Sequence, residues 1–481
     1  MNQERHQERD EKSKERHEES TEITKLILKA AEKARAEIGV VAKHPSTGKA
    51  AKWPIDCNIG PGLEGAIACE SKVGYVNGTD GLLSYRGYDI FELCAYSTYE
   101  EVSFLLLHGY LPNSTELHEF EQKLIKHRHM NKTLRLLMSF PVEDMNAMAA
   151  MRMGTIFMRQ EFTDADRESA KRDLENAISA DEDSIGMETK PSGERRAIYE
   201  FKKKKKRRRK KDSAFDDASG LDACYHLIAG VPTVTAAIAR IRHGLMPYEP
   251  LNDLSHAANL YYMMNGRRPT AIEERVLDVA LILHADHGMN ASTFAAMVVA
   301  STMSDIYFSI GSGIAALNGP LHGGANERVL DTLRDVGSPD NVETWVTRAL
   351  AKKKKIPGFG HRVYKTYDPR ARILGPLAKF RCEGCKTDIQ NLINTAEQLE
   401  FKVVSSLDQE KKIFPNVDYY SGVVYTRLGI DPAMFTPLFA VSRVAGWSAR
   451  VLEYMNNNRI FRPRALYTGE FNQVFKQVNE R

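Results

Sequence analysis

Three segments bounded by Gly and Pro in this 481-residue chain carry polar side chains for which a packed core has little use. They read GPLHGGANE (Gly319 to Glu327), GFGHRVYKTYDPRA (Gly358 to Ala371) and NVDYYSG (Asn416 to Gly422). Glycines around His322 let the backbone turn sharply and leave amide N–H groups free for anionic oxygens. A histidine there suits a hydrogen-bond donor aimed at a developing oxyanion, and a satisfied loop histidine is an equal alternative.

Two histidines and one aspartate in these segments, His322, His361 and Asp418, suit proton transfer beside a carbonyl group. The aspartate can remove the proton as a general base, while one histidine donates a hydrogen bond to the enol or enolate that forms. A condensation onto a second carbonyl would use the other histidine as its electrophilic partner. Spacing alone does not establish that the three side chains meet, so this chemistry is a hypothesis at this stage.

Three arginines, Arg370, Arg443 and Arg462, lie on separate segments of the second half of the chain. The planar guanidinium keeps its charge and binds carboxylates in a bidentate manner, so a buried arginine needs an anionic partner. Either a buried carboxylate or a bound ligand would serve Arg443, which lies in an apolar helical stretch. If the three arginines converge, they predict a substrate with more than one carboxylate.

The segment LHADHGMNAST contains His284 and His287 at the HxxH spacing of helical zinc sites. The known motif adds a glutamate base and a third ligand, and neither lies nearby, so a metal ion is not expected. The apolar residues before His284 repeat at helical spacing, and His284 continues their buried face. We therefore expect His284 in the core, and we expect His287, next to Gly288, to face a ligand.

Charge and cysteine content narrow the class of protein. Lys plus Arg number 67 and Asp plus Glu 63, so the formal net charge of +4 does not indicate a nucleic-acid-binding protein. Six cysteines are too few for a disulfide framework and fit a reducing compartment, and Cys382 and Cys385, a lone CxxC pair, are interpreted as ordinary thiols. No run reaches the ~18 apolar residues of a membrane span. The charged N-terminus has the features of neither a secretory signal nor a mitochondrial presequence, which favours a cytoplasmic enzyme.

Helical periodicity dominates the chain, strand-like segments are few, and no internal repeat is apparent, which predicts an all-α fold. Alternating apolar runs over Gly62 to Ile90, broken at two Gly-containing turns, predict one small β-hairpin. Helices are predicted over Ser114 to His129, Pro141 to Gln160 and Thr436 to Met455, among others. The Asn318-Gly319-Pro320 breaker ends the preceding helical run, so the first histidine motif is expected in a turn or at the start of a helix.

The N-terminal region differs in character from the predicted helical body. Residues 1–21 are almost entirely charged or polar and are expected to be disordered or a frayed helix. Apolar residues repeat at helical spacing from Ile23 to Ala34, which predicts an amphipathic helix that packs on the body or on a partner chain. The segment from His44 to Pro54 is interpreted as a linker.

Residues 162–217 are dense in charge, poor in large apolar side chains, and contain ten consecutive basic residues, Lys202 to Lys211. Such a segment cannot bury enough surface to offset the entropy of ordering, so it is predicted to be a disordered insertion. The functional alternative is a patch for nucleic acid, anionic lipid or targeting. The basic tract has no interleaved aromatic residues and follows an acidic stretch, which disfavours nucleic acid as a partner.

The three motifs resemble the signature segments of the citrate synthase family. The segments LHADHGMNASTF, GLEGAIACES…GLLSYRGYDI and AVSRVAG…RPRALYTGE resemble family segments as well, and all of them follow in family order. The resemblance covers Cys57 to Gln160 and Leu221 to Glu470. It implies a mostly helical enzyme that condenses acetyl-CoA with oxaloacetate to give citrate and CoA. It also implies no metal or organic cofactor, since the CoA thioester is a substrate.

The same resemblance implies roles for individual residues. Asp418 would take the acetyl methyl proton, His322 would donate to the thioester oxygen, and His361 would donate to the ketone of oxaloacetate. The residues that would hold oxaloacetate are His287, Arg370, Arg443 and, from the neighbouring subunit, Arg462. The residues that would line the CoA arm are Leu321, Gly323, Gly324, Ala325, Asn326, Ile356, Gly358 and Gly360, with Arg362 and Lys365 as phosphate contacts.

The implied organisation is a homodimer with shared active sites and no membrane attachment. Residues 1–56 would form an extension, 57–323 a large helical domain, 324–428 a small mobile CoA-binding domain, and 429–481 a return to the large domain with a C-terminal arm. The insertion is foreign to the family pattern, and the extension lacks the β-rich domain of the hexameric, NADH-regulated type. Oligomeric state and regulation therefore stay open.

Two alternative functions also stay open from the sequence. Synthesis of 2-methylcitrate uses the same chemistry with propionyl-CoA, and one methylene in an apolar pocket is worth only ~1–3 kcal/mol. A protein that binds nucleic acid or anionic surfaces through the basic tract, on an enzyme-like body, belongs to a different class. A missing catalytic residue would favour that second class, and none is missing.

Overall fold

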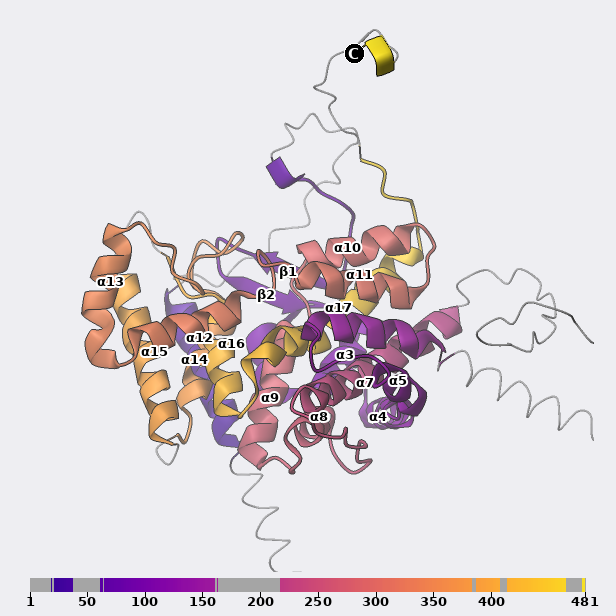
Figure 1. Cartoon of the computed structure of the whole chain (residues 1–481), viewed down its shortest axis with the longest axis horizontal. Helices are drawn as coiled ribbons and strands as arrows, with labels where there is room; N and C mark the ends of the chain where they lie inside the picture. Colours follow the sequence, from indigo (N-terminus) through magenta and orange to yellow (C-terminus); the bar gives the residue numbers. More distant parts are fainter. Residues whose placement is uncertain are drawn as a thin grey trace, which may run out of the picture.

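Helices make up most of the computed structural model, and one three-stranded antiparallel sheet accompanies them in the described part of the chain (Figure 1). The structure describes residues 19, 21–37, 61–63, 65–160, 162, 217–382, 386–406, 413–463 and 478–480. The predicted all-α class with one small hairpin is confirmed. The predicted linker, nearly all of the predicted insertion and most of the charged N-terminus lie outside the described residues.

The labelled elements have the following bounds. The strands are β1 (Gly74–Asn77), β2 (Leu82–Tyr85) and β3 (Tyr88–Asp89). The helices are α2 (Ile90–Tyr96), α3 (Tyr99–His108), α4 (Ser114–His127), α5 (Asn131–Leu137), α7 (Asp217–Ile241), α8 (His256–Asn265), α9 (Ala271–His284), α10 (Ala291–Ser301), α11 (Ile306–Leu317), α12 (Ala325–Val336), α13 (Val342–Ala351), α14 (Pro369–Lys379), α15 (Thr387–Ser406), α16 (Val417–Arg427) and α17 (Phe435–Met455). Short 3-10 turns are η1 (Pro61–Leu63), η2 (Pro339–Asn341), η4 (Pro432–Met434) and η5 (Val478–Glu480), and residues 21–37 and 147–160 are also helical.

Helix α17 is the central element of the body. All of its residues from Phe435 to Val451 are buried, and it packs against α3, α7, α9, α10 and α11 (Figure 1). A helix that is apolar on every face is expected to be buried in this way. Close packing depends on Gly446, because a Cβ there would lie 2.1 Å from the carbonyl oxygen of Ala285. The predicted helix is confirmed, and it carries Arg443 into the interior.

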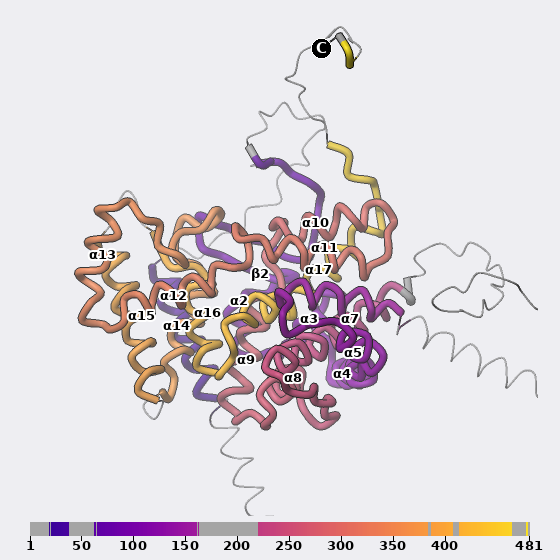
Figure 2. The backbone as a smooth tube through the Cα atoms, viewed as in Figure 1, coloured from indigo at the N-terminus to yellow at the C-terminus, as the bar shows by residue number. Residues whose placement is uncertain are grey.

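Helices α12 to α16 form a second group beside this body. Helix α16 packs against α12, α14 and α15, and α13 packs against α15. In Figure 2 these orange segments lie together on one side, between the end of α11 and the start of α17 along the chain. The predicted mobility of residues 324–428 remains a prediction.

The hairpin of β1 and β2 forms where the sequence predicts it. The strands pair antiparallel, and the Asn77 side chain closes the turn by accepting hydrogen bonds from two backbone N–H groups. The Gly78 carbonyl accepts from the Lys365 N–H at 2.7 Å. No side chain fits at Gly78, since a Cβ would lie 2.0 Å from the Val363 carbonyl oxygen. The turn of the hairpin therefore supports the segment that carries the second histidine motif.

The helix of residues 21–37 packs on the body, which resolves the alternative that the sequence left open. Its apolar stripe is buried and consists of Ile23, Ile27, Ala30, Ala31 and Ala34. Spacing of three to four residues places these side chains on one face of a helix.

Polar contacts show that this helix touches both α2 and α14. The Thr24 hydroxyl donates to a carbonyl at the end of α2 at 2.8 Å. Glu37 pairs with Arg372 near the start of α14, and Glu22 pairs with Arg381 just after its end, the latter at 2.7 Å. The N-terminal helix therefore runs antiparallel to α14 and joins it to α2.

The change Ile27→Ala is expected to lower the free energy of unfolding by about 2 to 5 kcal/mol, because it removes a fully buried side chain and leaves a cavity. Lys29→Ala, on the exposed face of the same helix, is the matched control and should stay within about 0.5 kcal/mol of wild type. Urea unfolding followed by circular dichroism measures both. Equal stability of the two variants would show that the helix does not pack on the body in solution.

Two predicted helix bounds need correction. The helix expected over Pro141 to Gln160 begins at residue 147, and the residues before it form turns. Asn146 caps it, since its side chain accepts from the Met148 N–H at 3.0 Å. Asparagine is a preferred N-cap residue, so the helix begins directly after Asn146, later than the apolar pattern predicted. At its C-terminal end, α4 stops at His127, two residues before the predicted end.

The interpretation of Cys382 as an ordinary thiol is wrong in this structure. Cys382 is buried and disulfide-bonded, and its partner sulfur lies outside the described residues. Cys69, Cys94 and Cys224 are free.

One helix of the described chain, Gly220–Ile241, is long and apolar enough to cross a membrane. Most of its apolar length is buried inside the protein, where it packs against α17, α8 and α4. A helix that is apolar all round and covered by other helices is typical of a protein core.

Candidate active site

The first histidine motif lies in the turn between α11 and α12, as the breaker before it predicts. The N–H groups of His322 and Gly323 both donate to the Gly319 carbonyl, at 2.9 and 3.2 Å. Gly323 is required by the packing of the chain itself, because a Cβ there would lie 2.3 Å from the Leu317 carbonyl oxygen. This glycine makes the turn possible and fixes the histidine relative to α11.

Ser292 in the first turn of α10 determines which nitrogen of His322 carries the proton. Its backbone N–H donates to Nε2 at 3.2 Å, and its Oγ lies 2.8 Å from the same atom. Because a backbone N–H can only donate, Nε2 is an acceptor and the proton resides on Nδ1. Burial, together with the charge of Arg443, lowers the pKa of His322 to about 4. At neutral pH His322 is therefore an uncharged donor through Nδ1.

A backbone crossing joins the second histidine motif to the aspartate motif. Phe359 and Pro415 form an antiparallel bridge, and the Asn416 N–H donates to the Gly358 carbonyl at 2.8 Å. Gly358 and Gly360 have φ of 78° and 80°, in the left-handed region that glycine adopts without strain. The glycines of this motif thus serve the crossing that brings the two motifs together.

Backbone N–H groups also set the tautomer of His361. Its Nδ1 accepts from the N–H groups of Val363 and Tyr364, at 3.0 and 3.1 Å, so the proton resides on Nε2. Burial lowers the pKa of His361 to about 4, and the charge of Arg370 acts in the same direction. His361 is likewise neutral at pH 7 and donates through Nε2.

His287 lies beside His361, and the centroids of the two rings are 5.3 Å apart. The Tyr364 hydroxyl is 3.2 Å from Nε2 of His287. Burial holds the pKa of His287 well below its usual value, and nearby arginines add to the effect. By contrast His284 is fully buried and its Nδ1 donates to the Ala280 carbonyl at 2.7 Å, as expected of a core histidine.

Arg370 is held by Asp368, the residue that caps α14. Asp368 accepts from Nε of Arg370 at 3.0 Å and from Nη2 at 2.8 Å, and both side chains are almost completely buried. The second carboxylate oxygen also accepts from the Val417 N–H at 3.1 Å. This arginine is thereby tied to the first turn of α16. A guanidinium has five N–H donors, so Arg370 retains donors for a bound anion.

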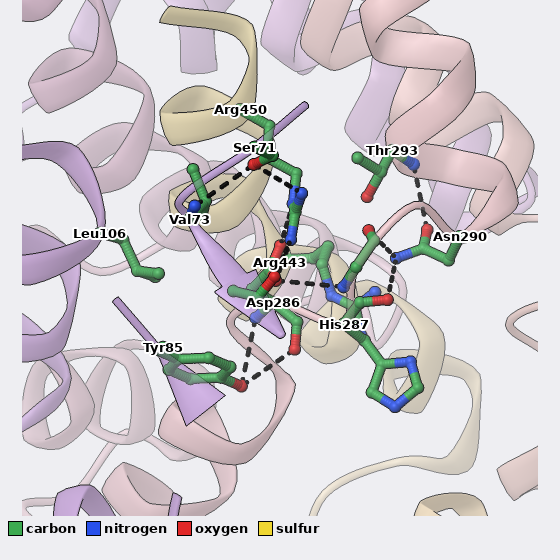
Figure 3. Close-up of polar contacts among 12 residues, drawn as sticks. Ser71, Val73, Tyr85, Leu106, Asp286, His287, Asn290, Thr293, Arg443 and Arg450 are labelled. Atoms are coloured by element: carbon green, nitrogen blue, oxygen red, sulfur yellow. Dashed lines mark hydrogen bonds and ion pairs between the residues drawn. The ribbon is translucent and has the colours of Figure 1, made fainter. Parts of the chain in front are cut away.

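Arg443 is buried without a carboxylate partner among the described residues. Its Nε donates to the His284 carbonyl at 2.6 Å, and the side chain is 1% exposed. Asp286, which lies close by, is bound instead by Arg450 through two bonds of 2.7 Å (Figure 3). Burial lowers the pKa of Arg443 to about 10, so the group is still charged at neutral pH. A buried and unpaired guanidinium is suited to an anionic ligand.

Asp418 lies in the first turn of α16 with one oxygen free. The Asn416 side chain caps this helix by accepting from the Asp418 N–H at 3.0 Å. Oδ1 of Asp418 is inaccessible to solvent and has no hydrogen-bond partner in the described part of the structure. Burial raises the pKa of Asp418 to about 6, while the charges of Arg370 and Arg443 oppose the rise. A carboxyl with a pKa close to neutral and an unpaired oxygen is well suited to accept a proton.

The predicted CoA-contact residues differ widely in exposure. Leu321 is 99% exposed, whereas Asn326 is fully buried and its Nδ2 has no partner among the described residues. Arg362 and Lys365 are exposed on the loop after the second histidine. Arg462 is exposed beyond α17, and within the described residues its guanidinium bonds only the Pro463 carbonyl. A single chain therefore does not bring Arg462 to the other arginines.

Several residues that shape the site escaped the sequence reasoning. Asp368 could have been found, since an aspartate before a proline at the first position of a helix is a cap signal. Ser292, Tyr364 and the Asp286–Arg450 pair act through contacts between segments far apart in the chain. No local pattern reports such contacts.

The described side chains converge on one site. The charge of Arg443 acts on both His322 and Asp418, and the charge of Arg370 acts on His361 and Asp418. No group of three or more His, Cys, Asp or Glu side chains in the described ranges is placed to hold a metal ion. Fold and site together define a mostly helical protein in which a buried carboxyl group and uncharged histidines lie beside buried arginines.

Comparison with known proteins identifies the family. The family model described as citrate synthase, C-terminal domain, matches residues 62–464. A citrate synthase of Acidithiobacillus ferridurans is 38% identical over 429 residues, which cover 88% of this chain and 99% of the relative. The chain belongs to the citrate synthase family, whose members are transferases.

Solved structures agree with this assignment. The crystal structure of citrate synthase from Pyrobaculum aerophilum is 36% identical, with a TM-score of 0.71, and the match covers 92% of this chain and 100% of that one. A citrate synthase from Thermoplasma acidophilum, solved as a ternary complex with carboxymethyl coenzyme A and oxaloacetate, is 29% identical, with a TM-score of 0.71. That match covers 87% of this chain and 98% of the other.

Proposed function

We propose that this protein condenses acetyl-CoA with oxaloacetate and water to give citrate and CoA. Family membership supports this reaction, and one observation supports the assignment of its steps to particular residues. Asp418, with a pKa of about 6 and an unpaired Oδ1, shares its site with two neutral histidines whose donor nitrogens are fixed by backbone N–H groups. A base and two uncharged donors are what an enol intermediate and its attack on a ketone require.

The first step is removal of a proton from the acetyl methyl group. Oδ1 of Asp418 takes that proton, and the C–H electron pair moves to form the enol carbon–carbon double bond. The Nδ1–H group of His322 donates to the thioester oxygen as negative charge develops there. His322 is neutral in this role because of its low pKa, so it stabilises the oxygen as a hydrogen-bond donor and not as a cation.

The second step joins the two substrates. The electron pair of the enol double bond forms the new bond to the ketone carbon of oxaloacetate while the thioester carbonyl re-forms. The ketone π pair moves onto its oxygen, which takes the Nε2 proton of His361, and the proton held by Asp418 restores the balance through solvent. Water then cleaves the resulting citryl thioester, which releases citrate and CoA. No metal or organic cofactor enters the scheme, since the CoA thioester is consumed as a substrate.

Binding of oxaloacetate is assigned to His287, Arg370 and Arg443, with Arg462 contributed by a neighbouring subunit. Arg370 and Arg443 are buried and charged, and Arg443 has no carboxylate partner among the described residues. The CoA arm is assigned to the turn of residues 321–326 and the loop of residues 356–365. Residues 324–428 would close over the substrates and keep the enol away from water.

Exposed apolar side chains mark a surface on which a second copy of the chain would pack. Phe308 of α11, Ile156 of the helix 147–160 and Phe140 are exposed large apolar side chains. These segments are adjacent, because a Cβ on Gly311 of α11 would lie 3.9 Å from Ile156. Exposed apolar groups from neighbouring helices are typical of a subunit interface. A homodimer in the cytoplasm is therefore part of this proposal.

Release of CoA by the purified full-length protein tests the function, with oxaloacetate present and acetyl-CoA compared with propionyl-CoA. A higher kcat/KM with acetyl-CoA supports citrate synthesis. A preference for propionyl-CoA would move the assignment to 2-methylcitrate synthesis. No release with either thioester would contradict the proposed reaction.

The rate should fall at acid pH with a single ionisation. Asp418 must be ionised to act as the base, so log kcat/KM is expected to rise with slope one up to about pH 6 and to level off above it. The histidines have pKa values of about 4 and stay neutral, so they add no break between pH 5 and 8. Initial rates in overlapping buffers measure the profile. Assay at pH 7.5 after incubation at pH 5 separates titration from unfolding, and a loss of rate above pH 6.5 would contradict the assignment.

A further inference from the structure

Glu400 on α15 accepts hydrogen bonds from two tyrosine hydroxyls. Its Oε1 is bonded by Tyr367 and its Oε2 by Tyr420, both at close range. The two tyrosines come from different segments, the loop before α14 and the first turns of α16. One carboxylate thus joins two segments that lie more than fifty residues apart in the chain.

The two tyrosines adjoin residues of the proposed site. Tyr367 directly precedes Asp368, the residue that holds Arg370. Tyr420 follows Asp418 by two residues on the same helix. Glu400 itself lies outside the site and is partly buried behind it.

Packing leaves little freedom to the tyrosine on α16. A Cβ at Gly375 of α14 would lie 3.1 Å from the Tyr420 ring, so the ring fills the space between α14 and α15. The guanidinium of Arg372 lies over the Tyr367 ring, 4.3 Å from its centroid. Burial raises the pKa of both phenols, which therefore stay protonated and serve as donors to Glu400.

Glu397, another carboxylate on the same helix, is an ordinary surface charge with which Glu400 can be compared. Glu397, one turn before Glu400, pairs with Lys379, and both side chains are more than 40% exposed. An exposed pair of this kind contributes little to stability or geometry. Glu400 differs, because its partners are a buried phenol, Tyr420, and a half-buried one, Tyr367, which belong to the segments of the base and of the arginine anchor.

We propose that Glu400 is a positioning residue of the condensation, which fixes the first turn of α16 relative to the Asp368–Arg370 anchor. Helices α14 and α16 also pack directly on each other, and the Val417 N–H donates to Asp368 at 3.1 Å. The Glu400 bridge adds hydrogen bonds at a second point of this packing, which constrains the rotation of the base relative to bound oxaloacetate. Misplacement of a catalytic group by about 1 Å can cost about 100-fold in rate. This inference rests on the proposed function, which assigns the base and the anchor.

The test compares three variants of the full-length protein. Glu400→Leu is expected to lower kcat about 10-fold or more while the Kd for oxaloacetate stays within about 3-fold of wild type. Glu400→Gln should restore most of kcat, because the amide can accept from one phenol and donate to the other. Glu397→Leu is the matched control on the same helix and should leave kcat unchanged.

A merely structural role would give a different pattern. It would lower the fraction of folded protein and leave kcat per folded active site unchanged, so kcat is referred to active sites counted by oxaloacetate binding. The change Tyr420→Phe should lower kcat in wild type and add nothing in the Glu400→Leu background, since the two residues act as one unit.

The outcomes separate this inference from the function on which it rests. Wild-type turnover is measured first, and its absence would overturn the condensation itself. Normal wild-type turnover together with unchanged kcat in Glu400→Leu would overturn only the positioning role. Equal losses of kcat in Glu400→Leu and Glu400→Gln would also overturn it, because the conservative amide would have failed to rescue the geometry.

Discussion

The change Asp418→Asn is expected to lower kcat for CoA release by about 1,000-fold or more, while oxaloacetate still binds. The amide keeps the shape of the side chain at the start of α16 and the cap made by Asn416. It loses the only feature that the reaction needs there, an oxygen that can take a proton. Steady-state release of CoA and calorimetric titration with oxaloacetate measure the two effects separately.

Stability should move in the opposite direction from activity in this variant. Burial raises the pKa of Asp418 from its ordinary value of 3.8 to about 6 in the folded chain. A raised pKa means that stability is lost as pH rises through about 6, when the buried group must ionise. The asparagine variant avoids that loss and should gain stability over wild type above pH 6.

Asp388→Asn changes an exposed aspartate in the first turn of α15. It is the control and should change neither activity nor stability. Normal turnover by Asp418→Asn would exclude Asp418 as the base.

The change Arg443→Leu is expected to weaken oxaloacetate binding about 100-fold or more without loss of stability. Removal of one partner from a buried charge pair typically costs about 2–5 kcal/mol of binding, and ~1.4 kcal/mol is tenfold in affinity. In the free protein the guanidinium is buried without a carboxylate ion-pair partner in the described residues, so its loss breaks no ion pair, and relief of the buried charge offsets the lost bond to the His284 carbonyl. Calorimetric titration and urea unfolding provide the two measurements.

Arg370→Leu provides the contrast that makes the result specific. It also removes a proposed oxaloacetate contact, but it leaves Asp368 buried and uncompensated, at a cost of about 3–5 kcal/mol of folding stability. The two leucine variants should therefore share the loss of affinity and differ in stability. Unchanged affinity in Arg443→Leu would remove that arginine from the site, and equal destabilisation of both would mean that it has an internal partner after all.

The sequence predicted the elements that depend on local pattern. The hairpin follows from turn residues between alternating runs, and α17 follows from apolar residues over its whole length. The three motifs drew attention to His322, His361 and Asp418 because polar residues among glycines have no use in a core. The structure adds a second reason for the glycines, which is the crossing of Phe359 with Pro415 and the tight turn at Gly323.

The remainder could not be predicted because it depends on contacts between distant segments. Which nitrogen of His322 carries its proton depends on Ser292, thirty residues earlier in the chain. Arg443 lacks an ion-pair partner among the described residues because Arg450 binds the nearby carboxylate of Asp286. Glu400 looks like any surface glutamate of an amphipathic helix until its two phenol partners are seen. Apolar periodicity also does not show where a capping residue starts a helix, as at residue 147, or whether a cysteine such as Cys382 is disulfide-bonded.

The N-terminal helix that joins α2 to α14 has a consequence for the kinetics of the enzyme. It meets α14 at Arg372, only two residues from Arg370, through ion pairs whose acidic partners are about half exposed. Any movement that separates α14 from α2 must break these pairs or detach the helix from α2. Exposed ion pairs weaken as salt screens them, with a Debye length of about 10 Å at 0.1 M. If residues 324–428 close over the substrates as proposed, the salt concentration of the medium would act on their reopening, and with it on the speed at which product leaves.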